Sequence, residues 1–111
     1  MGRYDLIKSI NEMINENIDV ILTTGGTGLD SRDITVETVE SLFEKRIEGF
    51  GELFRAKSYE EIGAAALLSR ATAGIYKKTA IFSMPGSPNA VKTACNIIIE
   101  ELPHVVHHIK K

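Results

Sequence analysis

The stretch VILTTGGTG, residues 20–28, decides the fold, because an apolar strand runs there directly into a glycine-rich turn. Glycines carry no Cβ and let backbone N–H groups approach an anionic ligand, while a helix that follows adds the positive end of its dipole. Ligands of open α/β sheets bind at such carboxyl ends of strands. The stretch therefore predicts a buried strand that ends in an anion-binding loop.

The residues after the glycines indicate what kind of loop this is. No lysine follows them, as a Walker A loop requires, and the G-G-x-G spacing differs from the G-x-G-x-x-G dinucleotide fingerprint. A tight structural turn is the alternative. Arg32 can pair with a phosphate, and Asp33 can hold hydrated Mg²⁺ or act as a base. These charges, together with the hydroxyls of Thr23, Thr24, Thr27 and Ser31, favour nucleotide or phosphate chemistry.

A second loop repeats the design of the first. Strand 79–84 ends at Met84, and Gly86 then precedes Ser87 as a helix N-cap and Pro88 as the first helical residue. This pattern predicts either a second anion site or only a well-capped helix.

Hydrophobic periodicity predicts the elements of the first half. Residues 4–17 and 34–43 carry apolar stripes at helical spacing, and Lys45-Arg46 would end the second helix favourably. Strand 18–23 is continuously apolar, which indicates cover on both faces. Residues 47–55 contain two glycines and are predicted to form a loop, with its phenylalanines in a subsidiary core or a subunit contact.

In the second half, Ser58 to Glu61 forms a capping box, so a helix is predicted from there to Leu68, with Arg70 as a favourable cation at its end. Residues 75–76 should be extended and 77–78 a turn. A long helix follows Ser87, and Pro103 is predicted to start a short last helix. This last helix carries His104, His107 and His108 at a spacing that can hold a metal, but no acidic or cysteine third ligand is near them, which favours a solvated helix.

Composition excludes several classes of protein. The 111 residues are 43% hydrophobic with a net charge of -2, typical of one globular domain and without the basic stripe of a nucleic-acid binder. Cys95 is the single cysteine, which excludes an intrachain disulfide and fits a reducing cytoplasm. No apolar run approaches the roughly 20 residues that span a bilayer. We therefore expect a cytoplasmic protein without nucleic-acid or membrane partners.

Several motifs together resemble the molybdenum cofactor biosynthesis proteins of the MogA/MoaB type, whose fold the gephyrin and plant Cnx G domains share. They are TGGTG with Arg32-Asp33, then GFGELFR from Gly49, SRATAG from Ser69 and MPGSP from Met84. The second and third lean toward the MoaB branch. The resemblance implies a three-layer α/β/α fold with a mostly parallel sheet.

The resemblance also implies how much of the family domain is present. A further strand, helix and strand are expected ahead of Tyr4, and they carry another acidic residue thought to work with the aspartate matching Asp33. Residues 1–111 are therefore expected to be a single molybdopterin-binding domain that corresponds to the C-terminal part of the family domain and is incomplete at its N-terminus.

The activity implied by the resemblance is that of a molybdopterin adenylyltransferase in molybdenum or tungsten cofactor biosynthesis. Such an enzyme binds Mg²⁺ with ATP, joins AMP to the terminal phosphate of molybdopterin and releases pyrophosphate. Asp33 would position Mg²⁺ as the catalytic residue, and the glycine loop would cradle phosphate. Arg32 would brace the loop or pair with a phosphate, and Ser69 with Ser87 would contact the pterin or nucleotide phosphate. Glu52 and Arg55 are weaker candidates. The binding residues implied are Thr24, Gly25, Gly26, Thr27, Gly28, Arg32, Ser69, Gly86 and Ser87.

Two other functions stay open at this point. One is a non-catalytic molybdopterin-binding or scaffold module of the same pathway. The other is a CinA-like hydrolase that releases AMP from ADP-ribose. The resemblance further implies a homotrimer or hexamer, and other molybdenum-cofactor biosynthesis proteins as partners.

Overall fold

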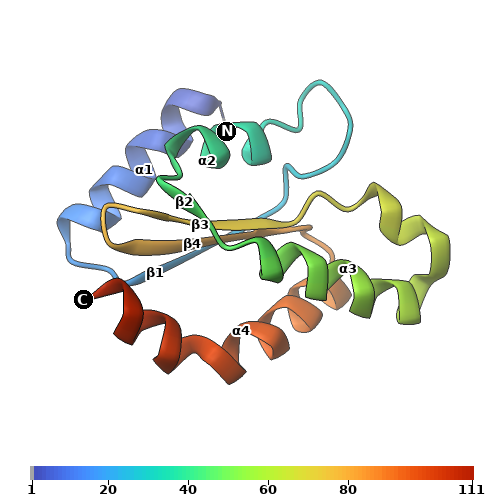
Figure 1. Ribbon diagram of the computed structural model, residues 1–111. Coiled ribbons are helices and arrows are strands. Elements are labelled where there is room, and N and C mark those ends of the chain that lie inside the picture. The colour runs from blue at the N-terminus through green and yellow to red at the C-terminus, as the bar shows by residue number, and fades with distance from the viewer. Residues whose placement is uncertain (1) are drawn as a thin grey trace.

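The computed structural model describes residues 2–111. In chain order the elements are α1 (Arg3–Asn15), β1 (Val20–Thr24), α2 (Thr35–Leu42), β2 (Lys45–Arg46), α3 (Glu48–Ile62), the 3-10 helix η1 (Gly63–Leu68), β3 (Thr72–Tyr76), β4 (Thr79–Met84) and α4 (Pro88–Ile109). The sheet lies between two helical layers, with α1 and α2 on one face and α3 and α4 on the other (Figure 1). This arrangement confirms the predicted three-layer α/β/α class.

The sheet is mixed rather than mostly parallel. Its strand order is β1-β4-β3-β2, and only the β1–β4 pair is parallel, while β3 runs antiparallel to both β4 and β2. The β3–β4 pair is antiparallel because of its connection, which consists of Lys77 and Lys78 alone. Both residues have positive φ, 49° and 62°. A two-residue hairpin turn of this kind can join only antiparallel neighbours.

Each helical layer has its own buried cluster, because side chains along a strand alternate between the two faces. On the α1/α2 face, Ile10 and Val39 pack with Ile21 and Ile81 of the sheet. The larger cluster lies on the other face and contains Phe50, Phe54, Ala71, Ala73, Ala80, Phe82, Met84, Ala94 and Ile98. The β4 strand is buried along its whole length and connects the two clusters.

The β1 strand is not covered on both faces, contrary to the prediction. Ile21 is 3% exposed, whereas Leu22 is 46% exposed. Leu22 pairs with Phe82 and therefore points to the α3/α4 face. Because β1 is the edge strand of the described sheet, Phe82 on β4 is covered by helices, whereas Leu22 on β1 stays in contact with solvent.

The predicted loop at residues 47–55 is helical from Glu48 onward, where it forms the first half of α3. Two glycines in a helix cost about 2 kcal/mol relative to alanine. Phe50 and Phe54 lie four residues apart, on one face of the helix, and are 4% and 1% exposed. Burial of two such rings contributes about 3–6 kcal/mol, so packing outweighs propensity.

Three other predicted boundaries are also wrong. Lys45-Arg46 does not end α2 but forms β2, which pairs with β3. Ser58 does not start a helix, because it is buried in the middle of α3. Pro103 lies inside α4, which continues to Ile109. Leu102, Val105 and Ile109 pack on the main cluster on both sides of this proline, and that packing holds the helix together there.

None of the helices in residues 2–111 combines the length and the apolar character that crossing a membrane requires.

Candidate functional site

The two predicted loops meet at one edge of the sheet. Because β1 and β4 are parallel neighbours, their carboxyl ends lie side by side. The N–H of Gly25 donates to the carbonyl of Met84 at 2.9 Å, which extends the ladder into the first loop. A Cβ added to Gly86 would lie 3.4 Å from the Cα of Gly25. The structure therefore brings Gly25 and Gly86, from the two predicted loops, into contact.

The first loop, residues 25–33, needs its glycines for two separate reasons. Gly25 and Gly26 have φ of 88° and 70°, the left-handed region that side chains disfavour. A Cβ at Gly26 would also overlap the hydroxyl of Thr35. The carbonyl of Gly26 accepts from the N–H of Thr35 at 3.0 Å, so the loop is anchored on the first residue of α2.

Asp33 is folded back over this loop. Its Oδ2 accepts from the N–H of Asp30 at 3.0 Å, while its own N–H donates to the carbonyl of Asp30 at 2.9 Å. A Cβ on Gly28 would lie 2.6 Å from Oδ2, so a larger residue there would displace the carboxylate. Asp33 is half-buried, and one oxygen, Oδ1, is left for a ligand.

Arg32 points into solvent, with its side chain 91% exposed. Its backbone N–H and its Nε donate to Oδ1 of Asp30 at 2.9 and 3.3 Å. The bond from the backbone N–H, and then the one from the side chain, hold the pKa of Asp30 below its usual range. Arg32 is thus placed to reach a phosphate outside the loop, but it does not brace the glycine turn itself.

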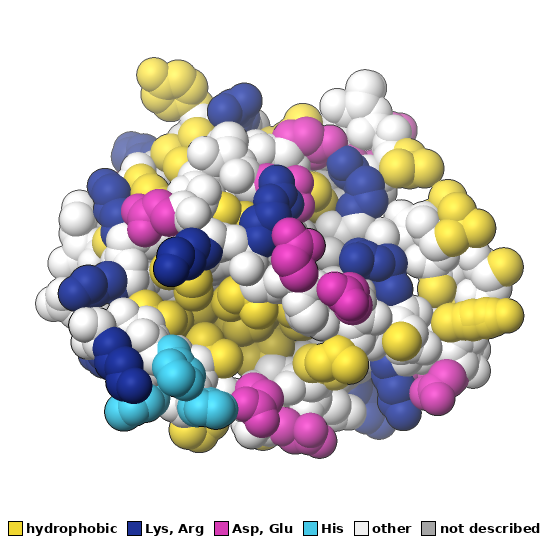
Figure 2. All heavy atoms as spheres, in the orientation of Figure 1, with side chains coloured by type: hydrophobic (Ala, Val, Ile, Leu, Met, Phe, Trp, Pro, Cys, Tyr) yellow, Lys and Arg dark blue, Asp and Glu magenta, His cyan; other side chains and the backbone are white. Residues whose placement is uncertain are grey.

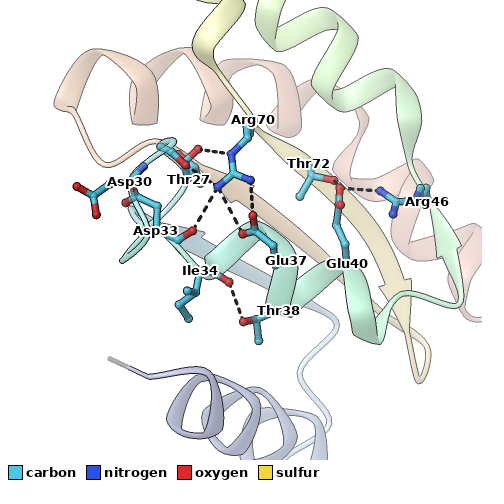
Figure 3. Close-up of polar contacts among 11 residues, drawn as sticks. Thr27, Asp30, Asp33, Ile34, Glu37, Thr38, Glu40, Arg46, Arg70 and Thr72 are labelled. Carbon is cyan, nitrogen blue, oxygen red and sulfur yellow. Dashed lines mark hydrogen bonds and ion pairs between the residues drawn. The ribbon is translucent and has the colours of Figure 1, made fainter.

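The residue that braces the turn is Arg70, which follows η1 (Figure 3). Its Nε donates to the carbonyl of Thr27 at 3.1 Å, and its Nη2 donates to the carbonyls of Gly28 at 2.5 Å and Asp33 at 3.3 Å. One guanidinium therefore holds both ends of the segment that carries Asp33. Thr27 is 5% exposed, so its carbonyl has little access to water as a substitute.

Glu37 of α2 completes this clamp. It accepts from Nη1 of Arg70 at 2.5 Å, and this hydrogen bond holds the pKa of the Glu37 carboxyl below its usual range. Arg70 is therefore already paired and is a support for the loop rather than a free cation for a ligand. The sequence predicts Arg70 only as a favourable cation at a helix end. Its role as a support depends on Thr27, which lies 43 positions away in the chain, so no local pattern signals it.

Ser69 is not brought together with Ser87. It lines a cavity of about 330 Å³ beside α2 and α3, whose described lining includes Arg46 and Arg55 but no residue of the glycine loop. The Ser69 hydroxyl accepts from the N–H of Ala71 at 3.4 Å. Arg55 donates from Nη1 to the carbonyl of Ala71 at 3.2 Å, so this weaker candidate also lies at the cavity.

Ser87 is the N-cap of α4, as predicted, and accepts from the N–H of Ala90 at 3.3 Å. Ser87 is exposed, and so is Thr24 at the end of β1. Glu52 lies outside both loops, on the exposed surface of α3. A partly buried polar pair lies between the two strands behind the loops, where Thr23 donates to the hydroxyl of Ser83 at 2.7 Å.

The arrangement is suited to holding a polyphosphate. The N-termini of α2 and α4 follow the two loops, and each contributes the positive end of a helix dipole. Residues 2–111 contain no group of three or more histidine, cysteine, aspartate or glutamate side chains placed to hold a metal ion. A cation at Asp33 would therefore take its other ligands from phosphate and water, as Mg²⁺ commonly does.

Comparison with known proteins agrees with this geometry. The chain belongs to the family described as probable molybdopterin binding domain, which matches residues 4–104. This confirms the resemblance inferred from the sequence motifs.

Within this family, the chain is similar to proteins named MoaB. It is 54% identical to molybdenum cofactor biosynthesis protein B of Bacillus subtilis, over 100% of this chain and 72% of that protein. It is 47% identical to molybdopterin adenylyltransferase of Pyrococcus furiosus, over 98% of this chain and 66% of that protein. The crystal structure of the tungsten cofactor synthesizing protein MoaB from Pyrococcus furiosus superposes with a TM-score of 0.94 at 46% identity. The match covers 99% of this chain and 71% of that structure's chain. The chain spans 62 to 72% of the length of these and similar curated relatives.

Proposed function

We propose that this chain binds ATP and molybdopterin and transfers AMP to the terminal phosphate of molybdopterin, with release of pyrophosphate. The observation that carries the proposal is the contact between the two glycine loops, Gly25 against Gly86, beside the carboxylate of Asp33. The relative named molybdopterin adenylyltransferase supports the choice of reaction. We also propose that residues 1–111 act as one molybdopterin-binding unit in this reaction.

The reaction requires positioning and charge neutralisation more than covalent chemistry by the protein. An anionic phosphate oxygen of the pterin must approach the α-phosphate of ATP in line with the leaving pyrophosphate. We propose that the N–H groups of residues 25–28 and of the Gly86 and Ser87 turn hold phosphate oxygens. Arg32 is exposed, and its guanidinium, which contacts Asp30 through Nε at 3.3 Å, would pair with one of them. Ser69 remains a candidate only for a ligand group that reaches its cavity.

Mg²⁺ with ATP is part of this proposal. The chemistry of the donor set fits this ion, because Mg²⁺ is usually held by one or two carboxylates together with substrate phosphates. Asp33 supplies one carboxylate oxygen that is not used by the loop. When bound there, the ion would offset the negative charge on the triphosphate.

The test is pyrophosphate release from Mg-ATP by the purified chain, with and without molybdopterin. We expect release that requires the pterin, and at least a roughly 100-fold loss in Asp33→Asn, because the amide keeps a hydrogen-bond acceptor for Asp30 but removes the charge. The matched control is Asp19→Asn, which makes the same change at the opposite end of β1, where Asp19 pairs with Lys110 at 3.1 Å. The control should keep the wild-type rate.

Each other outcome contradicts part of the proposal. No release from folded protein that still binds molybdopterin would support the alternative of a non-catalytic binding or scaffold module. AMP release from ADP-ribose without pterin would identify the hydrolase. Wild-type rates in Asp33→Asn would disprove the role of Asp33 while leaving the reaction intact.

We further propose a homotrimer or hexamer located in the cytoplasm, with other molybdenum-cofactor biosynthesis proteins as partners. Large apolar side chains are exposed on α3 and η1, namely Leu53, Tyr59, Ile62, Leu67 and Leu68. Such a patch is larger than scattered surface residues and is typical of subunit contacts. Sedimentation equilibrium tests the oligomer, and a monomer at micromolar concentration would disprove it.

A further inference from the structure

The last two turns of α4 carry a cluster of imidazoles that the proposed adenylyl transfer does not use. Figure 2 shows the histidine side chains gathered at one edge of the visible face. The rings of His104 and His108 lie 4.6 Å apart between centroids, while the ring of His107 lies 5.7 Å from that of His108. His104 and His108 are separated by one helical turn and therefore share a face of the helix.

The distance between their ring nitrogens is that of two ligands on one metal ion. Nε2 of His104 and Nε2 of His108 lie 3.0 Å apart. Two imidazole nitrogens bound to one ion at about 2.1 Å, at right angles or at the tetrahedral angle, are separated by roughly 3.0–3.4 Å. The backbone of α4 thus already places both donor atoms, and little conformational freedom remains to be lost when an ion binds.

Glu101 sets the tautomer of His104. Its Oε2 accepts from Nδ1 of His104 at 3.1 Å, so the lone pair of His104 is on Nε2, facing His108. Without an ion, Nε2–H of His108 donates to that lone pair. An ion bound at Nε2 of His108 would replace this proton, and the neutral His108 would then carry its proton on Nδ1. A carboxylate behind a ligating histidine is the usual support of a metal-binding imidazole.

The other charges near the pair come from the end of α4 and from Asp19. Lys110 is paired with Asp19 at 3.1 Å. The pair also lies at the C-terminal end of α4, where the helix dipole attracts a cation.

We propose that His104 and His108 form a two-nitrogen binding site for a borderline-soft divalent transition-metal ion, with Glu101 as the positioning residue. Residues 2–111 offer no third histidine, cysteine or carboxylate ligand in place, so water fills the remaining positions and the ion stays exchangeable. For such nitrogen ligands, the affinity should rise from Co²⁺ to Ni²⁺ to Cu²⁺ and fall again at Zn²⁺.

The experiment is calorimetric titration of the untagged chain with NiCl₂ and CuCl₂, together with the electron paramagnetic resonance spectrum of the Cu²⁺ form. We expect one equivalent per chain and nitrogen hyperfine structure from two imidazoles. His104→Ala and His108→Ala should each weaken binding by at least about 10-fold, and Glu101→Gln by about 10-fold. The matched control is His107→Ala, the third histidine of the same segment, which should bind within about 2-fold of the wild type.

Two results would overturn the site. In one, His107→Ala loses as much affinity as His104→Ala, which would indicate diffuse binding to the whole cluster. In the other, the His104→Ala/His108→Ala double variant binds like the wild type. Far-UV circular dichroism of each variant shows that α4 is intact, which these exposed substitutions should not disturb. Neither readout depends on adenylyl transfer.

Discussion

Replacement of Arg70 by alanine tests whether one guanidinium holds the glycine loop. The side chain is 26% exposed and donates to the carbonyls of Thr27, Gly28 and Asp33. The two shorter bonds are charge-assisted, and with partial replacement by water each contributes about 1–1.5 kcal/mol. The 3.3 Å bond and the exposed pair with Glu37 contribute about 0–0.5 kcal/mol together. We therefore expect Arg70→Ala to lower the free energy of unfolding by about 2–3 kcal/mol.

Urea denaturation followed by circular dichroism measures this loss, which corresponds to a fall of about 10 °C in the melting temperature. Hydrogen exchange of the backbone amides shows where in the structure this stability is lost. The amide of Thr35 bonds to the carbonyl of Gly26, and we expect its protection to fall by about 30-fold or more. Arg70→Lys should recover less than half of the loss, because one ammonium cannot reach carbonyls that a planar guanidinium spans.

Arg32→Ala is the matched control, since it removes the same type of side chain from a position that lies in the loop itself and is 91% exposed. Its free energy of unfolding should stay within about 0.5 kcal/mol of the wild type. If Arg70→Ala unfolds at the same urea concentration as Arg32→Ala, and the Thr35 amide exchanges equally fast in both, the clamp contributes nothing and the reasoning is refuted.

Two further predictions concern the stability of the β3–β4 turn and of the Arg70–Glu37 pair. Lys78 has a φ of 62°, so Lys78→Gly should raise the free energy of unfolding by about 1 kcal/mol in urea denaturation. Lys57→Gly, inside α3, should lower it by a similar amount. Equal shifts of one sign in the two variants would contradict the argument that Lys78 is strained. Glu37 has a pKa held below its ordinary value of 4.5 by Arg70, so its contribution is complete above that pH and is lost as the pH falls through the lower value in the folded state. Glu37→Gln should therefore lose less free energy of unfolding than the wild type between pH 5 and about pH 3. If the free energies of the two proteins fall in parallel over this range, the pairing of Glu37 with Arg70 does not contribute to the pH dependence.

The local features of the candidate site could be predicted from the sequence because they depend on neighbouring residues. The left-handed turn at Gly25 and Gly26 requires glycine, and the N-cap at Ser87 depends on a bond to Ala90, three residues away. Such contacts form within one turn of chain, where residue type alone limits the conformation. The contact between the two loops, in contrast, depends on the parallel pairing of β1 with β4.

The helical state of α3 could not be predicted in the same way. Its local sequence, with Gly49 and Gly51 around Phe50, favours a loop, and only the sheet beneath supplies the burial that reverses this preference. The same reason applies to Pro103, where packing of Leu102 and Val105 on the main cluster carries α4 past a residue that usually ends a helix.

Thus the sequence by itself determined the class of fold, the glycine-rich loop that carries Asp33 and the family to which the chain belongs. Only the tertiary structure decided which residue supports that loop and how the imidazoles of α4 face each other. Arg70 lies 43 positions from Thr27 in the chain, and no local pattern marks that contact. Its guanidinium reaches the loop because β3 and β4 bring the two segments to the same edge of the sheet, and that pairing depends on burial across the whole domain.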